Sequence, residues 1–212
     1  AEGVDVMFGI PGEETLDLMF AIRDSKIRFI PVRHEQGAAF MADVYGRLTG
    51  RAGVCLSTLG PGATNLVTGV ADAYLDGAPL VAITGQVGTD RMQLTSHHYL
   101  DLTAMFEPIT KRSKQIIRPD TVGEIVRLAF KHAEKGKPGA THIDLPQNIA
   151  KMHADAVPLK RQQMHEVYAD PAHIAAAGKI ISEAKNPVIL AGAGAVRGHA
   201  AAAVTELADR LH

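Results

Sequence analysis

Short apolar segments alternate with longer segments of helical periodicity along most of this chain. Six of the apolar segments are rich in Val, Ile and Phe: "VDVMFGIP", "IRFIPV", "GVCLST", "PLVAITG", "KQII" and "THIDLP". Near-continuous apolar strands are typical of a parallel sheet that helices cover on both faces. The pattern therefore predicts an α/β fold with a doubly wound parallel sheet.

The segment after "RHEQ" predicts a helix whose apolar residues lie on two faces. Ala38, Met41, Ala42 and Tyr45 share one face, and Phe40 and Val44 lie on another. A helix with apolar residues on more than one side is usually buried on more than one side. We therefore expect both faces of this helix to be covered.

The composition becomes mixed and charged over residues 156–171, which is typical of a linker between domains. Residues 172–212 then predict a helix, a buried strand in "NPVILAGAG" and a final helix in "AAAVTELADRLH". One strand and two helices are too few for a closed core. We expect a first domain in residues 1–155, a linker, and the truncated start of a second domain, so that the chain is a piece of a longer protein.

Charge and composition narrow the classes of partner. The 22 basic and 23 acidic residues nearly cancel, which argues against a nucleic acid or an anionic membrane as partner. No apolar run reaches the roughly 20 residues of a membrane span, and no signal peptide is recognisable. The single cysteine, Cys55, lies in a predicted strand and suits a reducing compartment. We expect a cytoplasmic protein.

Two glycine-rich turns follow predicted strands. In "LSTLGPGATN" the glycines would let a ligand approach the backbone at a helix N-terminus, although a tight structural turn explains them equally well. In "LAGAGAVRG" the spacing of Gly192, Gly194 and Gly198 misses the dinucleotide-binding pattern by one residue. A non-enzymatic nucleotide-binding module therefore stays open as an alternative, beside simple helix–sheet packing.

The chain has ten histidines, and His97 and His98 are adjacent. Neighbouring residues on an extended chain point in opposite directions, and no carboxylate or cysteine cluster stands at ligand spacing around this pair. We expect no metal site in this chain and a loop at this position.

Glu35 stands where an apolar strand ends and an Ala/Gly-rich helix begins, in "PVRHEQGAAF". An ionised carboxylate that is buried without a partner costs several kcal/mol. Glu35 therefore needs either a salt bridge, with Arg33 or Arg47 as local candidates, or a partner that can accept its proton.

Four stretches, in this order and spacing, resemble the pyrimidine-binding domain of thiamine diphosphate enzymes, and in particular acetolactate synthases. They are "GVDVMFGIPG", "RHEQGAAFMADVYGRLTG", "LSTLGPGATNLVTGVADAYLDGAPLVAITGQV" and "GKPGATHIDLPQN". The resemblance covers residues 1–155 densely. "NPVILAGAGA" is similar to the start of that family's Rossmann-like central domain.

The resemblance implies the site residues. In the family, the glutamate of the "HE" pair bonds N1′ of the cofactor's aminopyrimidine, and Glu35 takes that position. Gln93, or alternatively His98, corresponds to a glutamine near the reacting carbon, so Glu35 and Gln93 are the catalytic candidates. The implied cofactor-binding residues are Pro11, Gly12, Glu35, Thr58, Pro61, Gly62 and Asn65.

The resemblance also implies the reaction and the cofactors. Two pyruvate molecules would be condensed to 2-acetolactate and CO₂ with thiamine diphosphate and Mg²⁺. The diphosphate and Mg²⁺ motif, "GDG" followed by Asn, is not in this chain and belongs to a domain that the partner subunit supplies. The active site would form across a homodimer or tetramer, and this fragment alone would be inactive.

The segment from Gln86 to Pro108 resembles the catabolic acetolactate synthases, which lack FAD, so we expect no requirement for FAD. Sulfoacetaldehyde acetyltransferase, oxalyl-CoA decarboxylase and benzoylformate decarboxylase share the architecture and stay open as alternatives. Glyoxylate carboligase is disfavoured, because it lacks the glutamate that Glu35 supplies.

Overall fold

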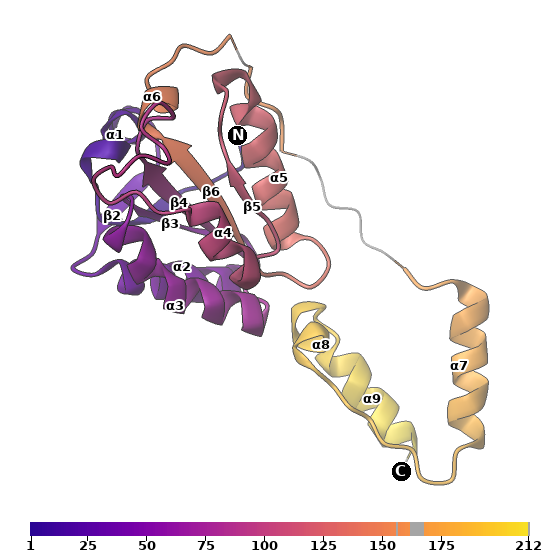
Figure 1. Cartoon of the computed structure of the whole chain (residues 1–212). Coiled ribbons are helices and arrows are strands. Elements are labelled where there is room, and N and C mark those ends of the chain that lie inside the picture. The colour runs from indigo at the N-terminus through magenta and orange to yellow at the C-terminus, as the bar shows by residue number, and fades with distance from the viewer. Residues whose placement is uncertain (156, 162–167, 212) are drawn as a thin grey trace. The chain divides into compact units, whose positions relative to one another are not determined.

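The computed structural model describes residues 1–155, 157–161 and 168–211. The chain divides into two compact units, residues 1–162 and 163–212, which are described separately (Figure 1).

The first unit is built around one six-stranded sheet in which every neighbouring pair of strands is parallel. The strands are β1 (Val6–Gly9), β2 (Arg28–Pro31), β3 (Gly53–Ser57), β4 (Leu80–Gln86), β5 (Ser113–Gln115) and β6 (Ala140–Pro146). Their order across the sheet is β2-β1-β3-β4-β6-β5. Each of the six predicted strands is present, and the predicted α/β fold with a doubly wound sheet is confirmed.

Helices cover both faces of this sheet (Figure 1). They are α1 (Leu16–Arg23), α2 (Glu35–Thr49), α3 (Pro61–Asp76), α4 (Leu102–Phe106), α5 (Val122–Glu134) and α6 (Gln147–Ala150), with 3-10 turns η1 (Glu13–Thr15), η2 (Glu107–Ile109) and η3 (Pro119–Thr121). Successive strand residues alternate between the two faces. Phe8 thus packs into a core with α2, α3 and α4, and Met7 into one with α1, α5 and α6.

One face of α2 is buried through small residues. Ala38, Ala39 and Ala42 have no exposed surface. A Cβ atom at Gly69 of α3 would lie only 2.6 Å from the Cβ atom of Ala39, so the two helices approach as closely as Ala and Gly allow.

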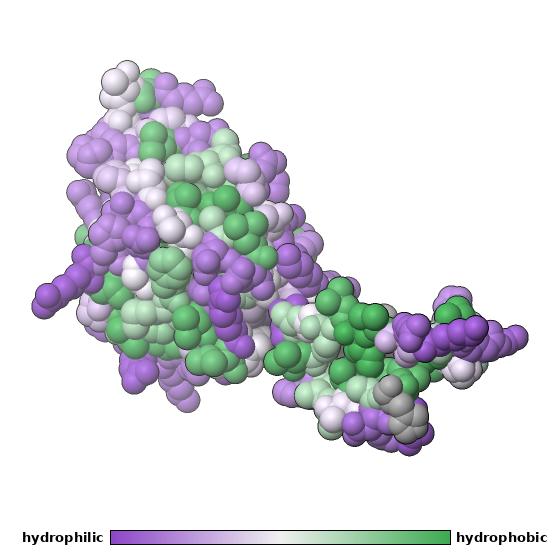
Figure 2. Space-filling view, turned by 90° about the horizontal axis from the view of Figure 1, so that it is seen from below, coloured by the Kyte–Doolittle hydropathy of each residue, from purple (hydrophilic) through white to green (hydrophobic). Residues whose placement is uncertain are grey.

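In the described part of the chain, the apolar residues of α2 are only partly covered. Val44, on the second predicted face, is 49% exposed, and Met41, predicted on the same face as the buried Ala38 and Ala42, is 40% exposed. Figure 2, which views the unit from the side where α2 and α3 lie, shows apolar surface there broken by polar groups. The exposed apolar residues on these two helices are Met41, Val44, Leu48 and Leu75.

The described part of the second unit contains α7 (Pro171–Glu183), α8 (Ala193–Arg197) and α9 (Ala201–Leu211). The two helices predicted here are confirmed, but the strand predicted in "NPVILAGAG" is wrong, since residues 186–192 have no regular structure. A strand needs a neighbour for its backbone hydrogen bonds. The described part of this unit offers none, and Leu190 is 96% exposed.

No helix in the described part of the chain is both long and apolar enough to cross a lipid bilayer.

Candidate functional site

The sheet has a topological switch point between β1 and β3. The chain runs from β1 outward to β2 and then crosses back to β3 on the other side of β1. In open α/β sheets, ligands bind beyond the carboxyl ends of the strands at such a point. Pro11 and Gly12 follow β1 there, and Thr58 follows β3, while Ile10 N donates to Leu56 O at 3.3 Å and joins the two segments.

Glu35 is the first residue of α2 and follows β2 closely. His34 caps the helix, because its Nδ1 accepts a hydrogen bond from the Gln36 amide at 3.2 Å. The Glu35 side chain is buried, with the residue only 8% exposed. The short connection after β2 and the helix cap therefore place a carboxylate beneath the surface at the carboxyl end of the sheet.

The partner of Glu35 is Asn65, on the first turns of α3. Asn65 Nδ2 donates to Glu35 Oε2 at 3.0 Å. The alternative of a salt bridge with Arg47 is wrong, because Arg47 pairs with Asp43, Asp72 and Asp76 instead. Within the described ranges Arg33 forms no ion pair with Glu35 either. Among these residues, only Asn65 donates a hydrogen bond to the Glu35 carboxylate.

Two glycines leave room beside this carboxylate. A Cβ atom at Gly62 would lie 3.2 Å from Glu35 Oε1 and 2.9 Å from Thr58 Cγ2. A Cβ atom at Gly12 would lie 2.3 Å from Thr58 Cβ, closer than any real contact. Glycine at both positions therefore lets the backbone approach Thr58, and any side chain at residue 62 would crowd Glu35 Oε1.

Thr58 also joins the turns that follow β1 and β3. Its hydroxyl Oγ1 donates to Glu14 Oε2 at 2.6 Å. The sequence reasoning missed this role of Glu14, although its position two residues after the "PG" turn in "GIPGEE" was a usable signal. The contact holds the two segments of the switch point together.

The remaining candidates lie at the edge of this site. Pro61 is the first residue of α3 and is exposed, as is Pro11. Gly60 has φ +53°, and a Cβ atom there would lie 2.6 Å from His98 Cβ. His98 therefore touches the turn before α3. Gln93 is exposed and has no hydrogen bond to Glu35 or Asn65 in the described residues, so its catalytic role stays a prediction.

The prediction that His97 and His98 point in opposite directions is wrong. Their ring centroids lie 3.6 Å apart, because His98 has φ +55° and the chain turns there. Residues 1–155, 157–161 and 168–211 contain no group of three or more His, Cys, Asp or Glu that could hold a metal ion.

A buried polar cluster spans β4, β5 and β6, and the sequence reasoning did not foresee it. Asp144 accepts hydrogen bonds from Thr84 at 2.9 Å and from Gln115 at 2.6 Å, and Gln86 Nε2 lies 3.5 Å from its Oδ2. Burial raises the pKa of Asp144 to about 6. Burial lowers the pKa of His142 to about 3, and its ring stacks on Phe106. The signal was polar residues within apolar strands, in "ITGQ" and "HIDLP".

Burial also raises the pKa of Cys55, to about 12. The thiol lies inside β3 with no exposed surface. It is an unreactive core residue, as expected for a strand thiol.

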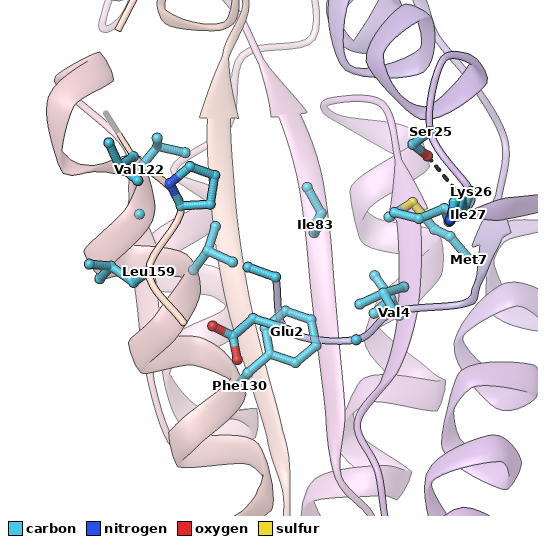
Figure 3. Close-up of a pocket in the computed structure, with 17 residues that line it drawn as sticks. Glu2, Val4, Met7, Ser25, Lys26, Ile27, Ile83, Val122, Phe130 and Leu159 are labelled. Atoms are coloured by element: carbon cyan, nitrogen blue, oxygen red, sulfur yellow. Dashed lines mark hydrogen bonds between the residues drawn. The ribbon is translucent and has the colours of Figure 1, made fainter. Parts of the chain in front are cut away.

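An apolar pocket of about 530 Å³ lies on the sheet face that α5 covers (Figure 3). Val4, Met7, Ile27, Ile83 and Phe130 are among its lining residues. Its one carboxylate, Glu2, is already paired with Arg127 at 3.1 Å. The residues that line the pocket do not include Glu35.

Comparison with known proteins agrees with this geometry. Residues 1–107 match the family described as thiamine pyrophosphate enzyme, N-terminal TPP binding domain. The chain therefore belongs to the thiamine pyrophosphate enzymes, and the recognition of this family from sequence motifs is confirmed.

The relatives it matches are named as acetolactate synthases. A probable acetolactate synthase large subunit of Methanocaldococcus jannaschii is 42% identical over 99% of this chain and 36% of its own length. A catabolic acetolactate synthase of Raoultella terrigena is 42% identical over 91% of this chain and 34% of its own length, and an acetolactate synthase of Arthrospira platensis is 39% identical over 99% of this chain and 38% of its own length. The chain thus spans little more than a third of these relatives.

Proposed function

We propose that the full-length protein is a thiamine diphosphate-dependent acetolactate synthase. It would condense two pyruvate molecules, with uptake of one proton, into one 2-acetolactate and one CO₂. The pairing of the buried Glu35 carboxylate with Asn65 at the switch point supports the cofactor chemistry. The names of the relatives support the choice of reaction.

Thiamine diphosphate, when bound, supplies the carbon nucleophile and the electron sink that decarboxylation of a 2-oxoacid needs. The role of Glu35 is acid–base: its Oε1 would share a proton with a pyrimidine nitrogen. Asn65 holds Oε2 and so orients the other oxygen. Burial of Glu35 strengthens such a hydrogen bond and keeps competing water away.

Pro11, Gly12, Thr58, Pro61 and Gly62 would line the pyrimidine site, with the two glycines giving the close approach described above. Gln93, or His98 in its place, would act near the reacting carbon. The contact between His98 and the Gly60 turn supports a position of this segment beside the site.

We assign residues 1–155 to the pyrimidine-binding domain, residues 156–171 to a linker and residues 172–212 to the start of a Rossmann-like central domain. The separation of the structure into two units supports this division. A further domain, contributed by a partner subunit in a homodimer or tetramer, would hold the diphosphate and Mg²⁺. The exposed apolar residues of α2 and α3 support such an interface. A cytoplasmic location stays a prediction.

The test is to purify the full-length protein free of flavin, to supply thiamine diphosphate, Mg²⁺ and pyruvate, and to follow acetolactate. The reaction involves no net oxidation or reduction, so we expect product without FAD. Product only after addition of FAD would contradict the assignment to the catabolic type. Acetyl phosphate or an aldehyde as the sole product would assign the protein to another member of the family.

A further inference from the structure

The segment between β4 and α4, residues 87–101, carries both Gln93 and His98. Both residues have positive φ, +63° and +55°, which is uncommon for residues other than glycine and persists only where the surroundings hold the chain in place. His98 lies against the Gly60 turn, which starts the helix that carries Asn65. The path of this segment therefore bears directly on the candidate site.

One side chain contacts both ends of this segment. Gln86 Oε1 accepts a hydrogen bond from the Val87 amide at 3.0 Å, and Gln86 Nε2 donates to the Leu100 carbonyl at 2.9 Å. Gln86 is fully buried at the end of β4. The chain leaves β4 at Val87 and comes back beside Gln86 at Leu100, just before α4, and the same carboxamide bonds to both points.

The sheet fixes the carboxamide in turn. Gln86 Nε2 faces Asp144 Oδ2 of β6, and Asp144 is itself held by Thr84 and Gln115. A buried amide costs free energy unless its hydrogen bonds are made, and an apolar residue of the same length would avoid this cost. A buried amide whose hydrogen bonds hold both ends of one loop is thus better explained by positioning of that loop than by core stability.

We propose that Gln86 is a positioning residue, which clamps both ends of the 87–101 segment and so holds Gln93 and His98 beside the candidate site, where they would contact pyruvate. The contact with pyruvate rests on the proposed function. The clamp itself rests only on the hydrogen bonds of Gln86. The two can therefore be tested by separate measurements.

Gln86→Met in the full-length protein removes the amide while it keeps length and flexibility. Thr141→Val is the matched control, because it removes a buried hydroxyl that donates to Leu80 O at 3.3 Å and to Ala129 O at 3.2 Å, without touching Asp144 or the 87–101 segment. The readouts are hydrogen exchange of residues 87–101 by mass spectrometry and steady-state kinetics with pyruvate. The amides of Arg91, Ser96 and Tyr99 are hydrogen-bonded within the segment and report its order.

For Gln86→Met we expect exchange in this segment to accelerate about tenfold, as the loss of hydrogen bonds of this kind allows. The KM for pyruvate should rise by a similar factor, and kcat should fall as well, because the segment carries Gln93 and His98, which are proposed to act near the reacting carbon. Thr141→Val should leave both readouts within about twofold of the wild type.

Equal effects of the two variants, or unchanged exchange in Gln86→Met, would overturn the clamp. If exchange accelerates but the KM for pyruvate does not move, the segment does not bind the 2-oxoacid and the proposal is wrong on that point. A wild-type enzyme without activity toward pyruvate would contradict the proposed function and leave the exchange result to decide on the clamp. Should Gln86→Met fail to fold, Gln86→Asn keeps a buried amide without a charge but is one methylene too short to bond to Leu100 as Gln86 does. Faster exchange of residues 87–101 would then support the clamp, and unchanged exchange would overturn it.

Discussion

The side-chain amide of Asn65 donates a hydrogen bond of 3.0 Å to the buried carboxylate of Glu35. The two residues belong to different helices, α3 and α2, and each lies in the first turns that follow a strand. The close packing of these helices, with Gly69 against Ala39, brings the amide within reach. One oxygen of Glu35 is thus oriented by the protein, and the other faces the space that Gly62 leaves open.

Replacement of Glu35 by Gln should slow acetolactate formation in the full-length enzyme by about 10² or more, in the range of general acid–base contributions. Glutamine keeps the shape and the buried position but cannot exchange a proton with a pyrimidine nitrogen. Glu13→Gln, at an exposed carboxylate of η1, is the control and should stay near the wild-type rate. Wild-type turnover by Glu35→Gln would refute the acid–base role.

Gly62→Ala should weaken the binding of thiamine diphosphate by about tenfold. The new methyl group would crowd both Thr58 and Glu35 Oε1, and overpacking of this kind costs about 1–3 kcal/mol. Isothermal titration of the full-length protein with thiamine diphosphate in the presence of Mg²⁺ measures the change. Gly178→Ala in α7, where a Cβ atom meets nothing within 4 Å, is the control and should bind normally. Normal binding by Gly62→Ala would show that the cofactor does not lie beside this residue.

The exposed apolar side of α2 and α3 should mediate self-association. Val44→Asp places a charge on this surface in each subunit, and burial of unpaired charges is strongly unfavourable. We expect the dissociation constant of the oligomer, measured by sedimentation, to rise at least about tenfold. Ile117→Asp, at an exposed apolar residue beyond β5, should have no effect. If both variants associate like the wild type, the interface lies elsewhere.

Asp144 should make stability depend on pH between about 4 and 6. Its pKa is raised from 3.8 to about 6 in the folded protein, so the folded state binds the proton more tightly than the unfolded state does. Stability from this group is therefore greatest at low pH and is lost as pH rises through this window. The rise of about two units in the pKa of Asp144 corresponds to about 3 kcal/mol in the free energy of unfolding.

Asp144→Asn removes the titrating group, so the difference between wild type and variant reports on Asp144 alone. Other groups contribute to both proteins, including His142, whose lowered pKa makes stability rise with pH. Urea unfolding of wild type and variant at pH 4 and pH 7 measures the difference. The wild type should lose stability from pH 4 to pH 7 relative to Asp144→Asn, so the free energy of unfolding of the variant minus that of the wild type should be larger at pH 7 than at pH 4. A constant difference would mean that Asp144 titrates normally.

The order and type of most elements could be predicted from the sequence alone. Most of the strands are local apolar runs, and a run such as "GVCLS" is apolar because both faces of β3 are buried. The exception is β5, whose residues Ser113–Gln115 are polar. Glu35 was also visible, since a single carboxylate between an apolar strand and an Ala/Gly-rich helix is locally unusual. Its proposed role in binding the cofactor, however, depended on the resemblance of four stretches of the sequence to thiamine diphosphate enzymes.

Other features were decided only by the tertiary structure. Local periodicity shows that α2 has two apolar faces, but whether a second face is covered depends on which element or subunit packs there. An apolar run such as "NPVIL" forms a strand only when a neighbouring strand supplies hydrogen bonds, and the described part of its unit supplies none.

The contacts of Gln86 with Leu100 and Asp144, and of Glu35 with Asn65, join residues that are far apart in the chain. From the sequence alone, Glu35 could be placed at the start of a helix, and Gln86 and Asp144 in or directly after apolar strands. Only the strand order and the helix packing determined which of them meet, because a hydrogen bond depends on the distance between two groups in space, and local patterns carry no information about that distance.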